Sequence, residues 1–228
     1  MSSGHLANDF FRRTIELQTR GHVNCVEIDQ KLIGGVESVV WDAALVLCKY
    51  IETAVARNQL VLNGIKVIEL GAGTGICSIV MAAFGAEVVS TDMSEVLPLI
   101  RHNVALNQHL IDEAKGSVTV DCLDWTNETD RARFSETKFD AVVLADCLYY
   151  EASLAPLLQT VDGLTRPNPN AEIICCFEDR DIGKPAEIQK AFFKQVTSLF
   201  EVISVDSCDM HEDFQSPDIY INKFRRLK

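Results

Sequence analysis

The sequence lacks any apolar stretch long enough to span a bilayer, which needs about 20 residues. Residues Met1–Thr14 also lack the apolar core of a secretion signal. These two absences argue against a membrane protein and against a secreted one. We therefore expect a cytoplasmic location, with the nucleus as the alternative.

Cysteines and histidines in metal-binding patterns are absent as well. The eight cysteines contain no C-x-x-C pair, the spacing common in zinc sites. Cys175 and Cys176 are adjacent in an apolar run, which suits buried free thiols better than a disulfide framework. The five histidines are scattered without ligand spacing. We predict free thiols in a reducing compartment and no metal ion.

The chain has fewer basic than acidic residues. The chain has 21 Lys and Arg against 33 Asp and Glu, a formal net charge of −12. Binding a phosphate backbone normally needs clustered Lys and Arg, so nucleic acid is not expected as the main partner. The negative net charge favours a basic substrate, although an equally negative net charge is as common in cytosolic enzymes that have no basic substrate.

What the chain does contain, from Lys66 onward, is an alternation of β-rich runs and helical stretches. In 228 residues this fits one α/β domain better than two and predicts a largely parallel sheet with helices on both faces. The predicted strands are Lys66–Leu70, Glu87–Asp92, Ser117–Leu123, Phe139–Ala145, Ala171–Phe177, Glu201–Val205 and Asp218–Phe224. The predicted helices are Ile76–Phe84, a stretch from Leu97 to Leu106, Ala155–Leu164 and residues 185–200.

A glycine-rich turn links the first predicted strand to its helix. Gly71, Gly73 and Gly75 form a G-x-G-x-G pattern; glycine adopts backbone angles that other residues resist, and no Cβ holds a ligand away. Asp92 ends the next strand, 21 residues after Gly71, where a carboxylate can accept hydrogen bonds from both hydroxyls of a ribose. The pattern predicts a nucleoside cofactor; the alternative is a tight turn without a ligand.

Two details choose between NAD and S-adenosylmethionine, which both carry such a ribose. The dinucleotide fingerprint is G-x-G-x-x-G, and Ile76 stands where its last glycine would be. Glu69, just before the turn, is a poor neighbour for a pyrophosphate but a suitable one for the cationic amino-acid end of S-adenosylmethionine. We therefore predict S-adenosylmethionine.

Three more candidates follow later strands, and a fourth lies before the first strand. Trp125 follows the third strand, where its ring would stack on an adenine or else cap the core. Asp146 and Tyr149 follow the fourth, in the crevice where ligands gather in open α/β sheets. Asp146 would orient an amine, and Tyr149 would offer a hydroxyl or an aromatic wall; alternatively, Asp146 caps the next helix and Tyr149 packs. Trp41, at a helix start, is more typical of a core residue.

Both ends of the chain depart from the alternation. A polar loop, residues 207–217, joins the last two strands without a helix, which indicates an antiparallel hairpin at the sheet edge. Residues 1–60 are expected to form a hairpin, Ile15–Ile28, and a helix from Val40 to about Ala54. We interpret them as a cap over the cofactor edge of a single domain, residues 1–228, whose seven-strand core is residues 61–228.

Several motif segments taken together carry a family resemblance. They are Gly34-Gly35, Val40–Leu47, Ile68–Gly75, Thr91-Asp92, Trp125, Ala145–Tyr150 and Ile173–Cys176. In these segments the chain resembles the methyltransferase-like 21 family of seven-strand protein lysine methyltransferases, and the likeness covers nearly the whole chain. It departs at Thr126, where relatives often have glycine, and this puts the loop around Trp125 in question.

The resemblance implies a Rossmann-like class I methyltransferase fold, a seven-stranded, mostly parallel sheet with an antiparallel C-terminal hairpin. It implies that Asp146 and Tyr149 form the lysine site, in a chain expected to be monomeric. The implied substrate is a lysine of the valosin-containing protein, a hexameric AAA ATPase chaperone. The implied contacts to S-adenosylmethionine, which reverse the core interpretation of Trp41, are Trp41, Gly71, Ala72, Gly73, Asp92, Trp125 and Ala145.

Two other functions remain open from the sequence. One is N- or O-methylation of a small molecule, since a fold does not fix the acceptor. The other is a binding protein that keeps the methyltransferase fold without catalysis. Replacing Asp146 separates them, because a catalyst would lose turnover and still bind cofactor, whereas a pure binder would keep its partner.

Overall fold

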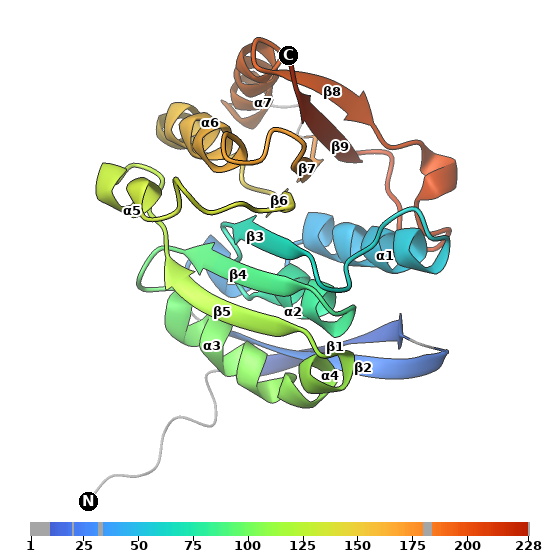
Figure 1. Ribbon diagram of the computed structural model, residues 1–228. Helices are drawn as coiled ribbons and strands as arrows, with labels where there is room; N and C mark the ends of the chain where they lie inside the picture. Colours follow the sequence, from blue (N-terminus) through green and yellow to red (C-terminus); the bar gives the residue numbers. More distant parts are fainter. Residues whose placement is uncertain (1–9, 20, 32–33, 180–183, 228) are drawn as a thin grey trace, which may run out of the picture.

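The computed structural model describes residues 10–19, 21–31, 34–179 and 184–227. Its centre is a seven-stranded sheet in the order β5-β4-β3-β6-β7-β9-β8 (Figure 1). The strands β3 to β7 are parallel, and β9 lies antiparallel between β7 and β8. The bounds are β3 Lys66–Leu70, β4 Glu87–Asp92, β5 Ser117–Cys122, β6 Ala141–Ala145, β7 Glu172–Glu178, β8 Phe200–Ser204 and β9 Ile219–Arg226. The predicted fold class is confirmed.

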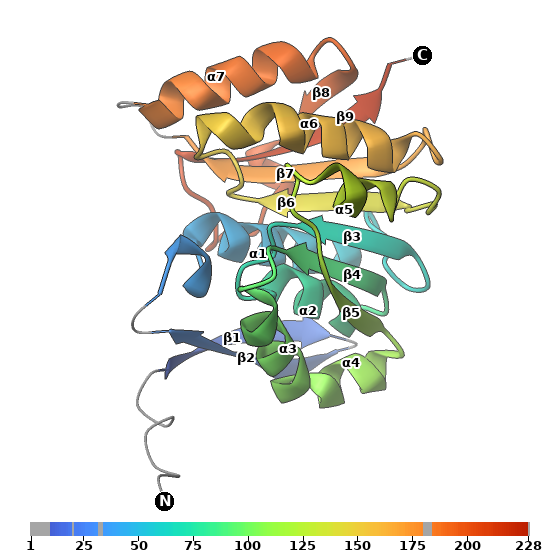
Figure 2. The same ribbon diagram turned by 90° about the vertical axis from the view of Figure 1, so that its left-hand side faces the viewer.

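Helices cover both faces of this sheet (Figures 1 and 2). One face carries the helices α1 to α4, and the other carries α6 and α7, with α5 beside them. The bounds are α1 Asp42–Ala56, α2 Ile76–Ala83, α3 Leu97–Leu106, α4 Gln108–Ala114, α5 Glu128–Ala132, α6 Glu151–Thr165 and α7 Lys184–Val196. Two short 3-10 turns, η1 Val36–Ser38 and η2 Ser207–Asp209, complete the list of helical elements described.

The core consists of two apolar clusters that the sheet separates. Successive side chains of a strand point to opposite faces, so Val67 joins the cluster under α1 to α4 while Ile68 joins the one under α6 and α7. Cys176 and Cys175 divide in the same way. A strand buried on both faces reads as a continuous apolar run, which is why the sequence predicted these strands well.

The N-terminal hairpin forms a third layer outside α2 and α3 (Figure 2). Its strands, β1 Phe10–Thr19 and β2 His22–Lys31, pair antiparallel, and Ile15, Leu17 and Val26 are buried against the helices. The hairpin is present and longer than the predicted Ile15–Ile28. None of its described residues lines the ligand pocket described below; within residues 1–60, the pocket is lined by the segment that follows the hairpin and by the start of α1.

The other differences from prediction concern the ends of elements and a few short helical elements. The strand β6 begins at Ala141 and not at Phe139, α6 begins at Glu151 and not at Ala155, and a 3-10 turn interrupts the loop before β9. The helices α4 and α5 were not predicted. In the described part of the chain, no helix has the length and apolar character needed to cross a membrane.

Candidate active site

A cavity of about 530 Å³ opens where β3, β4 and β6 end. Its size falls in the range of small-molecule sites, and it lies at the carboxyl ends of parallel strands, where open α/β sheets bind ligands. All ten residues predicted for the site line its wall: Trp41, Glu69, Gly71, Ala72, Gly73, Asp92, Trp125, Ala145, Asp146 and Tyr149. The structure thus brings every predicted site residue together, while their contacts to a cofactor stay predictions.

The glycine turn has the backbone geometry that its pattern predicts. Gly71, Gly73 and Gly75 all have positive φ, at +63°, +56° and +81°. A Cβ on Gly71 would lie 2.8 Å from the Sγ of Cys147 and 3.2 Å from the ring of Trp125. Only glycine avoids both the left-handed strain and these clashes.

Asp92 faces this turn from the end of β4. One carboxylate oxygen accepts the N–H of Gly73 at 2.8 Å, and the other accepts the N–H of Met93 at 2.7 Å. Burial raises the pKa of Asp92, against these two hydrogen bonds, which lower it. A carboxylate offers about four acceptor positions, so both oxygens keep capacity for the hydroxyls of a ribose.

Glu69 is almost fully enclosed, with 1% of its surface exposed. The hydroxyl of Ser78 donates to its carboxylate. Burial raises the pKa of Glu69 to about 7, although the Ser78 hydrogen bond opposes the shift. A buried carboxylate of this kind gains a favourable partner when a cation enters the pocket.

Trp125 forms an apolar wall of the pocket beside Gly71 of the turn. Its ring packs on the cluster beneath α6, and its Nε1 is buried without a hydrogen-bond partner among the described residues. The neighbouring Thr126, where a glycine was expected, donates from its N–H and hydroxyl to Asp124 at 2.8 and 2.7 Å. These bonds fix the loop and leave Trp125 in the pocket wall.

Trp41 is not a core residue. Its side chain is 39% exposed, and its Nε1 donates to the carbonyl of Val36 at 2.7 Å. That bond closes residues 36–41 into a compact segment, and the backbone oxygen of Glu37 lies 3.1 Å from the position of a Cβ on Gly73. This covering segment, residues 36–41, therefore lies against the glycine turn.

Asp146 adopts a strained conformation at the end of β6. Its φ is +53°, a region that costs a non-glycine residue about 1–3 kcal/mol, and its N–H donates to the carbonyl of Cys176 at 2.8 Å. The N-cap of α6 is Tyr150, four residues later, so Asp146 does not cap that helix. Asp146 itself lines the pocket.

Tyr149 and Tyr150 extend the pocket toward solvent. Their rings lie 4.5 Å apart at 58°; Tyr149 is partly buried, and Tyr150 is 58% exposed. Burial raises the pKa of the Tyr149 phenol, so the hydroxyl stays protonated at neutral pH and acts as a hydrogen-bond group. The two rings form an aromatic side of the pocket next to Asp146.

The sequence did not reveal several pocket residues. Val36, Glu37, Met93, Tyr150 and Ser153 all line the cavity. Met93 and Tyr150 carry a usable signal, since each directly follows a predicted site residue. Val36 and Glu37 carry none, because long-range packing of the segment brings them to the turn.

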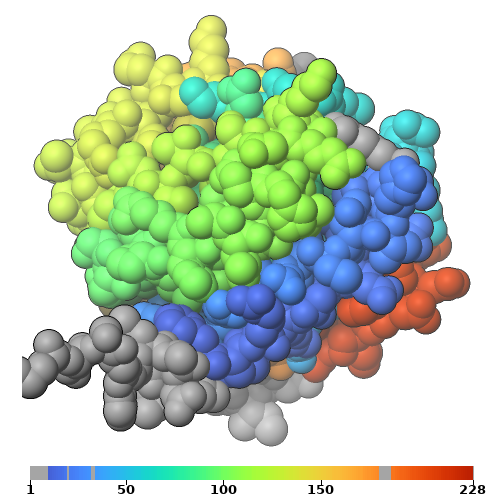
Figure 3. Space-filling model, turned by 90° about the horizontal axis from the view of Figure 1, so that it is seen from below, coloured from blue at the N-terminus to red at the C-terminus, as the bar shows by residue number. Residues whose placement is uncertain are grey.

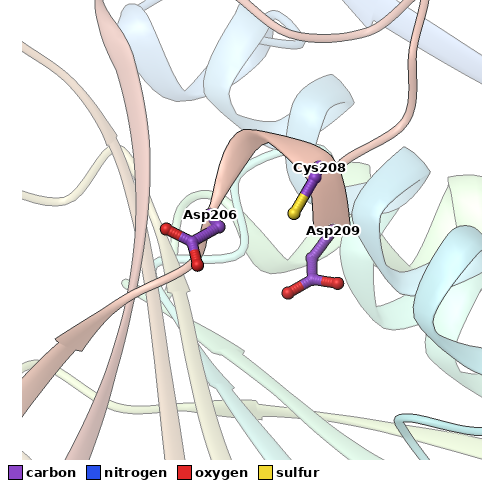
Figure 4. Close-up of side chains that lie close together, drawn as sticks. All are labelled: Asp206, Cys208 and Asp209. Atoms are coloured by element: carbon purple, nitrogen blue, oxygen red, sulfur yellow. The ribbon is translucent and has the colours of Figure 1, made fainter.

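A cluster of metal-ligand type lies elsewhere, in η2. Figure 4 shows its members, Asp206, Cys208 and Asp209, and it is the one such group in the described ranges. Asp209 already accepts a hydrogen bond from Gln59 at 3.0 Å and lies 3.9 Å from Arg57. These contacts tie the loop to the end of α1, and no metal role is assigned to it.

The pocket fits S-adenosylmethionine. Positive φ and the absence of Cβ atoms at Gly71 and Gly73 create a cradle for a close-lying ligand. A buried donor such as Trp125 Nε1 is costly unless a ligand or a water pairs with it. Glu69 offers negative charge to a cation, and Asp92 offers acceptors to a ribose.

The fold and this pocket define a class I, S-adenosylmethionine-dependent methyltransferase. The structure of the 16S rRNA N2 G1207 methyltransferase RsmC of T. thermophilus matches with a TM-score of 0.58 and 14% identity, over 95% of this chain and 51% of that one. Magnesium protoporphyrin IX methyltransferase of Synechocystis matches with a TM-score of 0.54 and 17% identity, over 81% and 80%. At such identities the likeness concerns the fold alone.

Sequence relatives identify the family within this class. The model of a lysine methyltransferase family matches residues 22–199. Protein N-lysine methyltransferase METTL21A of Danio rerio is 34% identical over 71% of each chain. Protein-lysine methyltransferase METTL21E of Mus musculus is 38% identical over 56% of this chain and 51% of its own. The chain belongs to this lysine methyltransferase family and is a protein-lysine methyltransferase that uses S-adenosylmethionine.

Proposed function

We propose that the chain methylates a lysine of the valosin-containing AAA ATPase chaperone, with Asp146 and Tyr149 as the residues that receive the lysine. The site assignment is supported by one observation: Asp146 and Tyr149 line the same pocket as the glycine turn. A methyl donor held by the turn and an amine held by Asp146 would then meet within one cavity.

The chemistry requires a neutral, well-oriented amine. When bound, S-adenosylmethionine supplies an electrophilic methyl group on a positively charged sulfur. The lysine ε-ammonium would first release a proton to solvent, which a partly apolar pocket favours. Asp146 would orient the amine, and the work of the protein is positioning and exclusion of water.

Tyr149 has a different role in this proposal. Its phenol stays protonated because burial raises its pKa, so it does not serve as the base. Its ring and that of Tyr150 offer aromatic faces to the alkyl chain and charge of a lysine. The hydroxyl can hold the nitrogen in line by a hydrogen bond.

The mouth of the pocket favours a macromolecular acceptor. Four large apolar side chains that line it are at least 39% exposed: Val36, Trp41, Met93 and Tyr150. Exposed apolar groups around a cavity are typical of surfaces that bind other molecules. The net charge of −12 adds an attraction for a lysine-bearing segment.

The choice of this chaperone rests on the sequence resemblance. One relative is named for another substrate: a protein from Xenopus tropicalis, 38% identical over 58% of this chain and 54% of its own, is named EEF1A lysine methyltransferase 3. Membership alone therefore does not fix the substrate, and elongation factor 1A provides a natural control protein.

Mass spectrometry of the reacted chaperone tests the proposal. The purified chain is incubated with S-adenosylmethionine and either the chaperone hexamer or elongation factor 1A, and tryptic peptides are analysed. We expect one chaperone peptide to gain the mass of one or more methyl groups on lysine, and none in the Asp146→Asn reaction. Methylation of elongation factor 1A with an unchanged chaperone would contradict the substrate assignment.

A further inference from the structure

Two buried asparagines of α3 and its C-terminal junction join the N-terminal hairpin to the core. Asn103 and Asn107 are both 0% exposed. Residues four positions apart lie on one face of a helix, and here that face meets β2. Figure 3 shows the hairpin, in blue, lying along α3 and α4, in green.

The two side-chain amides take the place of a neighbouring strand. Asn107 accepts the N–H of Glu27 at 2.9 Å and donates to its carbonyl at 2.7 Å. Asn103 does the same for Asp29, at 2.9 and 3.1 Å. The outward N–H and C=O groups of an edge strand need such partners, so both asparagines stabilise the attachment of the hairpin.

The second Nδ2 proton distinguishes the two asparagines. Asn103 donates it to the carbonyl of Thr74 at 2.9 Å, whereas Asn107 donates it to the carbonyl of Asn103 at 2.8 Å. Thr74 lies between Gly73 and Gly75, within the glycine turn. Asn103 alone of this pair therefore connects the hairpin to the cofactor pocket.

The end of β2 also holds the covering segment, which contributes to the lining of the pocket. Gln30, 2% exposed, accepts the N–H of Val40 at 2.7 Å through its Oε1. Val40 directly precedes Trp41, in the segment that covers Gly73. Two successive residues of β2 thus hold the two walls: Asp29 holds the glycine turn through Asn103, and Gln30 holds the covering segment.

We infer that Asn103 is a positioning residue for S-adenosylmethionine: it fixes the glycine turn against the hairpin and so makes cofactor affinity depend on a layer that does not touch the pocket. Loss of the side chain would release the Thr74 carbonyl and allow the turn to move relative to the covering segment. The inference rests on the cofactor site and is independent of which protein is methylated.

Asn103→Ala and Asn107→Ala form a matched pair for the test. Each removes two hydrogen bonds to the hairpin and one to a carbonyl, and the Asn107 side chain makes no capping bond to α4. We expect similar falls in the thermal unfolding midpoint. The Kd of S-adenosylmethionine, measured by calorimetry, should rise about tenfold in Asn103→Ala, as for a lost buried hydrogen bond, and less than about twofold in Asn107→Ala. Equal changes in both variants, or none in either, would overturn the inference.

Hydrogen exchange in the unmodified protein provides a second measurement that needs no folded variant. Cofactor binding should slow exchange of the Asp29 amide, which bonds to Asn103, more than that of the Glu27 amide, which bonds to Asn107. Equal protection of both amides, or none, would also overturn the inference. A wild-type protein that bound no cofactor in calorimetry would instead refute the cofactor assignment itself.

Discussion

The two halves of the pocket are built in different ways. The proposed cofactor half is built around a backbone turn: three glycines with positive φ, held by the buried carboxylate of Asp92 and by Asn103. The proposed acceptor half consists of side chains at the junction of β6 and α6: Asp146, Tyr149 and the exposed Tyr150. Its helix begins without a side-chain capping bond.

This difference indicates a division of labour. Backbone held by buried hydrogen bonds is rigid before a ligand arrives, whereas exposed aromatic side chains gain their fixed positions when a partner packs on them. We expect substitutions in the cofactor half to change cofactor affinity, and substitutions in the acceptor half to change turnover with affinity preserved.

Asp146→Asn should have the largest effect. Asparagine tolerates positive φ as aspartate does, so the turn is kept while the charge is lost. We expect kcat for protein methylation to fall at least about 100-fold, as for loss of a proton-handling or orienting group. The measurement is transfer of labelled methyl to the substrate protein.

Glu151→Gln serves as the control for this change, since Glu151 is an exposed acid in the first turn of α6, close to Asp146 in the chain. It removes one negative charge from α6 and should leave kcat within about twofold. A similar fall in kcat in both variants would mean that Asp146 acts only through the overall negative electrostatic potential of the surface.

Gly71→Ala should abolish tight cofactor binding. The new Cβ would meet Cys147 at 2.8 Å and Trp125 at 3.2 Å, and we expect the Kd of S-adenosylmethionine to rise at least about 30-fold through strain and overpacking together. Gly64→Ala is the matched control, because Gly64 has φ +77° but nothing within 4 Å of its Cβ position. A binding defect shared by both would point to strain in the fold and not to the cradle.

Trp125→Ala should weaken cofactor binding by about tenfold, the loss typical of an aromatic surface under a base. Trp125→Phe keeps an aromatic ring and should remain within about threefold of the wild type. Calorimetric titration with S-adenosylhomocysteine measures both. If alanine and phenylalanine weaken binding equally, the ring does not stack and only the size of the tryptophan matters.

The Glu69 carboxylate should give cofactor binding a modest pH dependence. With a pKa of about 7, it is largely protonated below neutral pH, and a cationic ligand favours its ionised form. Affinity should rise a few-fold between about pH 6 and 8, and Glu69→Gln should flatten this rise. A wild-type profile unchanged by the substitution would exclude Glu69 from contact with the cation.

The stability of the empty protein should show the opposite sign. Folded Glu69 keeps its proton above the ordinary pKa of 4.5, up to about 7. Its contribution to the free energy of unfolding therefore falls as pH rises through that window. Thermal unfolding of the wild type and of Glu69→Gln at pH 5 and pH 8 measures it, and the substitution should reduce the difference between the two.

The cofactor half was predictable because its determinants are local. The pattern of Gly71, Gly73 and Gly75 between a strand and a helix specifies the turn, and parallel strands place Asp92 and Asp146 at one sheet edge. The helix α5 was missed although its signal was present, since Asn127 caps it by accepting hydrogen bonds from Thr129 and Asp130.

Only Trp41 of the covering segment was predicted as a site residue, and the rest was missed for a physical reason. Nothing in the residues 36–40 specifies a ligand, and their place depends on contacts such as Gln30 with Val40 and Glu37 with Gly73. For the same reason the hairpin was predicted as part of the cap. It contacts the walls of the pocket only indirectly, through Asn103 and Gln30. The single-domain division, the monomeric state and the cytoplasmic location stay predictions.

The most direct test of the separation is a calorimetric titration of Asp146→Asn with S-adenosylmethionine, on a sample whose methyl transfer has been assayed. We predict a Kd within about twofold of the wild type together with the 100-fold loss of turnover expected for an orienting group. A variant that lost cofactor binding along with turnover, or that kept both, would show that Asp146 does not belong to a separate acceptor half.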